Sequence, residues 1–193
     1  MIAMRSGRFI SIAFSTILAV ATVACYWRAI SCDFVGLDDP GYVSRNPKVL
    51  AGLSFAGWNY AWSTRDCSNW HPLTWLSLQL DSTVWGTTPR GYHATNIALH
   101  AINSVLLFCV LVRSTGRRIC AAIVAAFFAL HPLRVEAVAW VSGRKELLAV
   151  TFVLASLYSY AAAQKSEAAN AKRKHTVLAL VWFLCALLSK PMA

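Results

Sequence analysis

Residues 37–43 have the sequence Leu-Asp-Asp-Pro-Gly-Tyr-Val and follow the first long apolar run of the chain, residues 9–30. About 20 apolar residues are enough to cross the hydrocarbon core of a membrane, so the run predicts a first transmembrane helix. Two of only eight acidic residues therefore stand side by side where a helix leaves a membrane. We interpret Asp38 and Asp39 as catalytic carboxylates. The alternative is that they start a short surface helix, because Asp before Pro is typical of a helix N-terminus.

The composition predicts an all-α, polytopic membrane protein with about five transmembrane helices. Of 193 residues, 58% are hydrophobic and 13% are charged, whereas soluble domains contain about 25% charged residues. The net charge is +10, but the basic residues cluster in short segments between apolar runs, where they set membrane orientation. The composition therefore indicates a lipid bilayer as partner and argues against nucleic acid.

Four further spans are predicted after an external loop at residues 31–93; they lie at residues 94–112, 119–133, 147–163 and 176–190. The third has only residues 119–130 as strictly apolar sequence, so it either stops partway or ends in a protein-lined cavity. Residues 113–118 and 164–175 are basic, which places them and the N-terminus in the cytoplasm. Seven of the eight acidic residues then lie on the opposite side. The chain stops soon after the fifth span, which suggests the N-terminal part of a longer protein.

The external loop contains five of the eight tryptophans, and tryptophan favours the membrane–water interface. Residues 69–80 and, more weakly, residues 53–62 predict amphipathic helices that lie on the bilayer. Cys32 and Cys67 both fall in this loop and either form a disulfide or stay free.

Polar side chains at His93, Asn96, His100 and Asn103 recur at steps of three and four, so they share one helix face that should point into the bundle or a wet cavity. Such a stripe is more often interhelical contact than catalysis. A second polar group lies between the third and fourth spans and comprises His131, Arg134, Glu136, Arg144, Lys145 and Glu146. Its cations suit phosphate oxygens. The alternatives are internal salt bridges or contacts with anionic lipid. His71 and His131 each precede a Pro-Leu pair. A helix that begins at the proline accounts for this pattern better than a metal site formed by the two histidines does.

The order of these motifs resembles the membrane part of the TMTC-like family, transmembrane proteins with tetratricopeptide repeats that are distantly similar to protein O-mannosyltransferases of the GT-C fold. The resemblance covers residues 9–193. It is carried by the Asp38-Asp39 segment, residues 92–100 (YHATNIALH), residues 131–141 (HPLRVEAVAWV), residues 144–148 (RKELL) and the closing residues 189–191 (SKP).

The resemblance implies a membrane glycosyltransferase that moves a sugar, mannose in the first instance, from a polyprenyl-phosphate donor to a Ser/Thr hydroxyl of an acceptor protein on the non-cytoplasmic side. It maps the family's acidic motif onto Asp38 and Asp39, with Arg134, Arg144, Lys145 and Lys190 as phosphate ligands and His131 and Glu136 beside them. A divalent metal is left open. The membrane would be the inner membrane of a bacterium or the endoplasmic reticulum of a eukaryote. The alternatives are a non-enzymatic anchor for a downstream repeat domain and, more weakly, a transporter.

Overall fold

The computed structural model describes residues 2–191, with side chains from residue 9 onward. The side chains of Arg5 and Arg8, which belong to the predicted basic N-terminus, lie outside that description. Every regular element within the described residues is a helix, and no strand occurs among them. The predicted all-α class is therefore confirmed.

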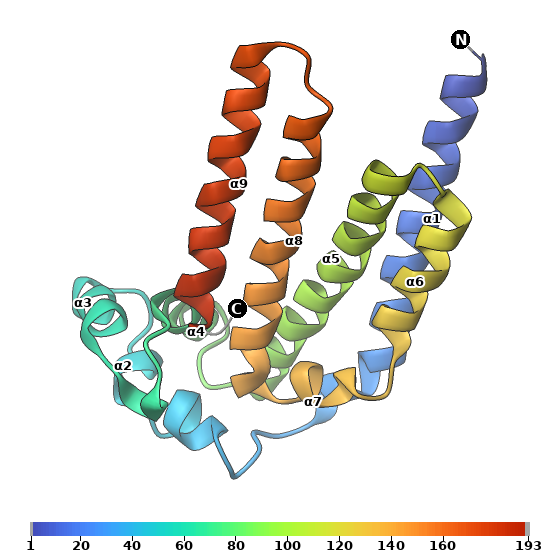
Figure 1. Cartoon of the computed structure of the whole chain (residues 1–193). Coiled ribbons are helices and arrows are strands. Elements are labelled where there is room, and N and C mark those ends of the chain that lie inside the picture. The colour runs from blue at the N-terminus through green and yellow to red at the C-terminus, as the bar shows by residue number, and fades with distance from the viewer. Residues whose placement is uncertain (1, 192–193) are drawn as a thin grey trace.

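Long helices stand side by side in a bundle (Figure 1): α1 (Ile2–Tyr26), α5 (Pro89–Thr115), α6 (Arg118–Leu130), α8 (Arg144–Gln164) and α9 (Ala169–Ser189). α8 packs against both α9 and α5, and α5 packs in turn against α1 and α6. The α5–α6 and α8–α9 turns lie at the same end of the bundle as the N-terminus. Gly116 closes α5 with a φ of 73°, a left-handed conformation that glycine adopts without a Cβ clash.

Short helices form a layer at the opposite end of the bundle, where the described C-terminal residues also lie. Between α1 and α5 these are η1 (Trp27–Ser31), the π-helix η2 (Pro40–Ser44), α2 (Pro47–Leu50), α3 (Phe55–Ser63), η3 (Asp66–Ser68) and α4 (Pro72–Trp85). Between α6 and α8 they are α7 (Arg134–Ala139) and η4 (Val141–Gly143). The two helices predicted in the external loop are thus present as α3 and α4.

Local sequence explains where several of these helices begin. Pro72 and Pro89 occupy the first turns of α4 and α5, where the missing proline N–H costs no hydrogen bond. The Asn46 side chain accepts hydrogen bonds from the N–H groups of Lys48 and Val49 and caps α2. The proline start places the beginning of α5 five residues before the predicted residue 94.

Within the part of the chain that the structure describes, three helical segments are long and apolar enough to cross a membrane: Phe9–Ser31, Pro89–Thr115 and Val141–Gln164. They correspond to the first, second and fourth predicted spans. α6 has 13 residues, or about 20 Å of helix at 1.5 Å per residue. α9 has 21 residues, but Lys172, Arg173 and Lys174 lie near its start. Neither α6 nor α9 by itself meets the length and polarity expected of a span.

The loop layer has its own apolar core, built on Tyr42, Val49, Trp75, Leu78 and Tyr92. Full burial of each such side chain contributes about 1.5–3 kcal/mol to stability, so the layer is a packed part of the protein. Trp75 has no exposed surface, so this tryptophan packs inside the layer and faces neither lipid nor water. It lies on the inner face of α4, against α2 and α3.

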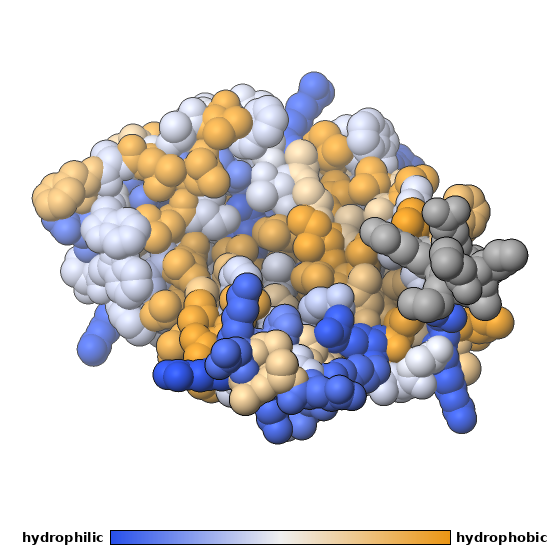
Figure 2. All heavy atoms as spheres, turned by 90° about the horizontal axis from the view of Figure 1, so that it is seen from above, coloured by the Kyte–Doolittle hydropathy of each residue, from blue (hydrophilic) through white to orange (hydrophobic). Residues whose placement is uncertain are grey.

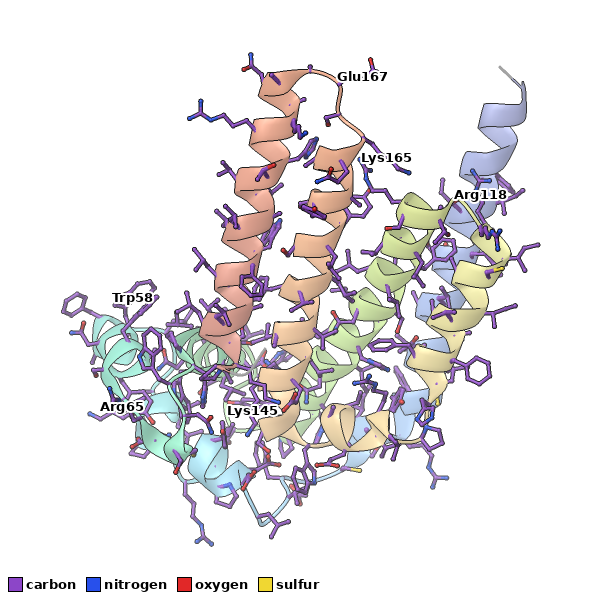
Figure 3. The ribbon with its side chains drawn as sticks, in the orientation of Figure 1. Trp58, Arg65, Arg118, Lys145, Lys165 and Glu167 are labelled. Atoms are coloured by element: carbon purple, nitrogen blue, oxygen red, sulfur yellow. The ribbon has the colours of Figure 1, made fainter. Side chains whose placement is uncertain are left out.

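Charged side chains lie at both ends of the molecule. Figure 3 places Arg118, Lys165 and Glu167 at the end with the two turns, Arg65 in the loop layer, and Lys145 at the start of α8 near that layer. Figure 2 looks onto the end with the turns and shows hydrophilic side chains gathered along one side, with apolar side chains across the middle.

Candidate functional site

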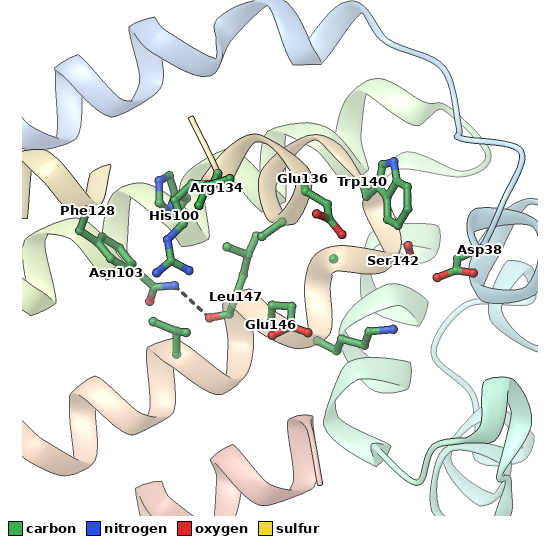
Figure 4. Close-up of a pocket in the computed structure, with 15 residues that line it drawn as sticks. Asp38, His100, Asn103, Phe128, Arg134, Glu136, Trp140, Ser142, Glu146 and Leu147 are labelled. Carbon is green, nitrogen blue, oxygen red and sulfur yellow. Dashed lines mark hydrogen bonds between the residues drawn. The ribbon is translucent and has the colours of Figure 1, made fainter. Parts of the chain in front are cut away.

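A cavity of about 410 Å³ lies where the loop layer meets α5, α6 and the start of α8 (Figure 4). Residues from Asp38 to Val150 line it, and they come from segments far apart in the sequence. Its lining combines charged side chains with apolar ones, among them Phe128, Leu133, Leu147 and Val150. A cavity of this kind suits a ligand that has both a polar and an apolar end.

The cavity lining includes four of the predicted site residues: Asp38, Arg134, Glu136 and Lys145. Glu146, which belonged to the same predicted polar segment, lines the cavity too. The Arg134 guanidinium lies over the Phe128 ring, with 4.5 Å between its central carbon and the ring centroid. Cations and carboxylates from three separate segments therefore face one space.

Lys190, another predicted phosphate ligand, does not line the cavity and forms an ion pair with Glu146. Their side chains are 27% and 40% exposed, respectively. Because Glu146 lines the cavity, the ion pair places the end of α9 beside the cavity. His131 also lies outside the cavity lining; it is exposed, and its Nδ1 accepts a hydrogen bond of 3.2 Å from the Leu133 N–H.

The two adjacent aspartates have different environments. Asp38 is exposed and lines the cavity. Asp39 has no exposed surface; its Oδ2 accepts a hydrogen bond of 2.8 Å from the Val35 N–H, and its Oδ1 accepts one of 2.9 Å from the Ser142 N–H. Asp39 does precede a helix with Pro40 in the first turn, but its side chain makes no capping hydrogen bond. It joins the loop after α1 to η4 instead.

Arg144 lies outside the cavity lining and has no exposed surface. Its guanidinium donates hydrogen bonds to Asp81 Oδ2 at 2.6 Å, Ser77 Oγ at 2.8 Å and the Tyr92 carbonyl oxygen at 3.0 Å. Its Nε donates to Asn96 Oδ1 at 2.5 Å. Arg144 therefore joins α4, α5 and α8. The sequence left open whether the cations of this segment form internal salt bridges or contact anionic lipid, and Arg144 forms an internal salt bridge with Asp81.

The sequence analysis did not predict a role for Asp81. A signal was present, because Asp81 is an acidic residue directly after the predicted amphipathic helix of residues 69–80. Burial raises the pKa of the Asp81 carboxyl, while the nearby Arg144 guanidinium and the hydroxyl of Thr95 act to lower it. The Thr95 hydroxyl donates a hydrogen bond of 2.8 Å to Asp81 Oδ1. Both carboxylate oxygens thus have a donor.

The polar stripe of α5 points into the protein, as predicted: His93, Asn96, His100 and Asn103 all have no exposed surface. Asn96 Nδ2 donates to the carbonyl oxygens of Val138 and Trp140, at 3.2 Å and 2.6 Å. Asn103 Nδ2 donates to the Leu147 carbonyl oxygen at 3.0 Å. The two asparagines therefore hold the α7–α8 connection against α5.

Lys145, the neighbour of Arg144, is turned toward the cavity. Its ammonium donates a hydrogen bond of 3.0 Å to the Tyr42 hydroxyl. Burial raises the pKa of Tyr42, against the lowering influence of Lys145. The Tyr42 ring stacks on His71, and burial, helped by the Lys145 charge, lowers the pKa of His71 to about 4.

The described residues contain no group of three or more His, Cys, Asp or Glu side chains placed to hold a metal ion. All six cysteines lie in the described range and are free, so the Cys32–Cys67 disulfide is not present. His71 immediately precedes α4, which agrees with the helix-start interpretation of its Pro-Leu neighbourhood.

The fold and the cavity define a helical membrane protein with a charged cavity at one end of its bundle. The chain is 32% identical to protein O-mannosyl-transferase TMTC3 of Mus musculus over 95% of its own length and 20% of that protein. It is 33% identical to TMTC4 of Homo sapiens over 90% of its own length and 27% of that protein. It is also 33% identical to TMTC1 of Mus musculus over 76% of its length and 16% of the relative. The chain belongs to the TMTC-like family.

The chain spans only 16–27% of the length of these curated relatives. No family model matches it. No solved structure matches it.

Proposed function

We propose that this chain forms part of a membrane glycosyltransferase that moves a sugar, mannose in the first instance, from a polyprenyl-phosphate donor to a protein hydroxyl. The observation that carries the proposal is a single cavity that Asp38, Arg134 and Lys145 all line. Its apolar side chains would take the start of a polyprenyl chain, and its cationic side chains the phosphate. The printed names of the relatives, protein O-mannosyl-transferases, support the same class of reaction.

In the proposed membrane arrangement, α6 and α9 complete a set of five spans. Short α6 would cross with the help of a locally thinned bilayer, and α9 by keeping its three basic residues at the headgroup level. The end of the bundle with the two basic turns, near Arg118 and Lys165, would face the cytoplasm. The cavity and the loop layer would then face the non-cytoplasmic side, where the acceptor protein would approach.

The proposed chemistry is a substitution at the anomeric carbon of the donor sugar. The acceptor Ser/Thr oxygen forms a bond to that carbon as the bond from the carbon to the phosphate oxygen breaks. Asp38 takes the proton of the hydroxyl, and the departing polyprenyl phosphate carries away the bonding electrons as negative charge. Lys145 and Arg134 would stabilise that charge, because ammonium and guanidinium groups bind phosphate oxygens strongly.

Asp38 is preferred over Asp39 as the base in this scheme. A general base must reach the proton that it accepts, and Asp38 lines the cavity. Both oxygens of Asp39 already accept backbone hydrogen bonds, and the residue is fully buried. Arg144 and Asp39 would then hold the cavity wall in shape without touching substrate.

The test uses the chain in membranes of a host that lacks protein O-mannosylation, with radiolabelled polyprenyl-phosphate mannose and a Ser/Thr-rich acceptor peptide. Label should appear on the peptide, and Asp38→Asn should lower the initial rate by about 10²-fold or more, as loss of a general base does. Asp66→Asn is the matched control, because Asp66 is an acid of the same layer that does not line the cavity. Equal rates for the wild type and Asp38→Asn would contradict the assignment.

A further inference from the structure

The cations near the cavity differ in how their charge is used. Arg144 is paired with Asp81, and Lys190 is paired with Glu146. Among the described side chains, Lys145 has no such ion pair; its hydrogen-bond partner is the neutral hydroxyl of Tyr42. A hydroxyl can hold an ammonium in place without cancelling its charge. The Lys145 ammonium is therefore not already bound to a carboxylate and can meet an anionic ligand in the cavity.

Tyr42 is itself held firmly. Its side chain is 2% exposed. The ring stacks on Trp75, with centroids 5.1 Å apart and an interplanar angle of 21°, and on His71 at 5.6 Å and 13°. These stacked contacts lie in the apolar core of the loop layer. The hydroxyl is consequently a fixed acceptor on a rigid support.

Lys145 needs such a support because its side chain is a flexible stem with a single charged end. Fixing a free lysine side chain costs conformational entropy whenever a ligand has to order it. The ammonium also lies near the face of the Tyr42 ring, with 4.7 Å to the ring centroid, so a cation–π attraction adds to the hydrogen bond. Together these contacts order the lysine before any ligand arrives.

We propose that Tyr42 is a positioning residue that holds the Lys145 ammonium ready for the phosphate of a lipid-linked ligand. The inference rests on the proposed function, since it assigns the cavity to a polyprenyl phosphate. It goes beyond that function by giving a role to a residue that is outside the cavity lining. Tyr42 acts through Lys145 and does not contact the ligand.

The experiment measures binding of farnesyl phosphate, a short polyprenyl phosphate, to the chain in lipid nanodiscs. Intrinsic tryptophan fluorescence is a suitable signal, because Trp140 lines the cavity. Binding is compared for wild type, Tyr42→Phe, Lys145→Met and the double variant. Farnesol, which has the same chain without phosphate, and inorganic phosphate, which has no chain, are the two ligand controls.

Tyr42→Phe should weaken farnesyl phosphate binding about 3- to 10-fold, the effect of one lost charge-assisted hydrogen bond on ligand positioning. Lys145→Met should weaken it more, and the double variant should match Lys145→Met alone, because Tyr42 has nothing to position once the lysine is gone. Farnesol binding should be unchanged in all variants. A purely structural effect of Tyr42→Phe would lower farnesol binding as well.

Tyr60→Phe is the matched variant control. Tyr60 packs on Trp75 in the same aromatic group, but its hydroxyl bonds to Asn46 and Asp66 and has no contact with Lys145. Its farnesyl phosphate affinity should equal that of the wild type.

Two failures are distinguishable. If Lys145→Met weakens binding but Tyr42→Phe does not, or if the two effects multiply in the double variant, the positioning role is wrong and the phosphate site stands. If Lys145→Met binds farnesyl phosphate as the wild type does, the assignment of the phosphate in the proposed function is wrong, and the role of Tyr42 falls with it.

Discussion

Replacement of Asp81 by leucine is the most direct test of how the cavity wall is held. The Arg144 side chain is 0% exposed and that of Asp81 is 6% exposed, so the substitution leaves a buried guanidinium without its counter-charge. Removing one partner of a buried pair costs about 3–5 kcal/mol. Arg144 keeps neutral acceptors at Ser77, Asn96 and the Tyr92 carbonyl, so we expect the lower half of that range for the free energy of unfolding.

A double variant separates the effect of the buried Arg144 charge from the effect of side-chain packing. Asp81→Leu with Arg144→Met replaces the pair by apolar groups, and such replacements of buried pairs are often neutral or stabilising. The double variant should therefore be more stable than Asp81→Leu alone. Unfolding in mixed detergent micelles, followed by circular dichroism, gives the free energies.

Glu146→Gln provides the control, since it breaks the half-exposed pair with Lys190. Exposed pairs contribute at most about 1 kcal/mol. Two results would contradict the role of the buried Asp81–Arg144 pair. One is a loss of unfolding free energy in Asp81→Leu no larger than that in Glu146→Gln, and the other is a double variant less stable than Asp81→Leu.

Three further outcomes follow from the same contacts. The pKa of His71 is about 4 in the folded protein and 6.5 in the unfolded chain. As pH falls from 6.5 toward 4, the unfolded chain binds a proton that the folded protein does not, so the free energy of unfolding decreases. His71→Phe, which keeps an aromatic ring for stacking, should remove this part of the pH dependence in acid unfolding curves. Asp39→Asn should lower the melting temperature because it disturbs two buried hydrogen bonds, whereas exposed Asp38→Asn should leave it unchanged. Gly143→Ala should cost about 1–3 kcal/mol, because an added Cβ would lie 2.5 Å from a backbone oxygen of α7, while Gly36→Ala, with nothing within 4 Å, should cost little.

The apolar runs predicted the long helices because each run must bury or shield a continuous hydrophobic face. The boundaries were less accurate where polar sequence continues a helix. α9 begins at Ala169, before its apolar part, since lysine and arginine are good helix formers. α5 begins at Pro89, within what the sequence suggested was still loop. The packing of the loop layer around Trp75 depends on tertiary contacts that no local pattern records.

The sequence identified a charged segment but could not say which cation faces the cavity. Successive residues on a helix point about 100° apart, so Arg144 and Lys145 at the start of α8 must face different surroundings. The choice depends on Asp81, which is 63 positions away from Arg144. Lys145 is left to face the cavity for that reason. A pattern of charges in one segment carries no information about such a distant partner.

The same limit applies to the two aspartates. Asp39 is the buried one because the Ser142 N–H, 103 positions away, comes within hydrogen-bond distance of it. That contact joins the loop carrying Asp38 to the turn that leads into Lys145. If the proposed function holds, loss of Asp39 should therefore displace both groups and lower sugar transfer, even where Asp38 is the base. Loss of activity in Asp39→Asn cannot by itself identify the base; the base is the aspartate whose replacement lowers the transfer rate while the melting temperature and farnesyl phosphate affinity stay unchanged.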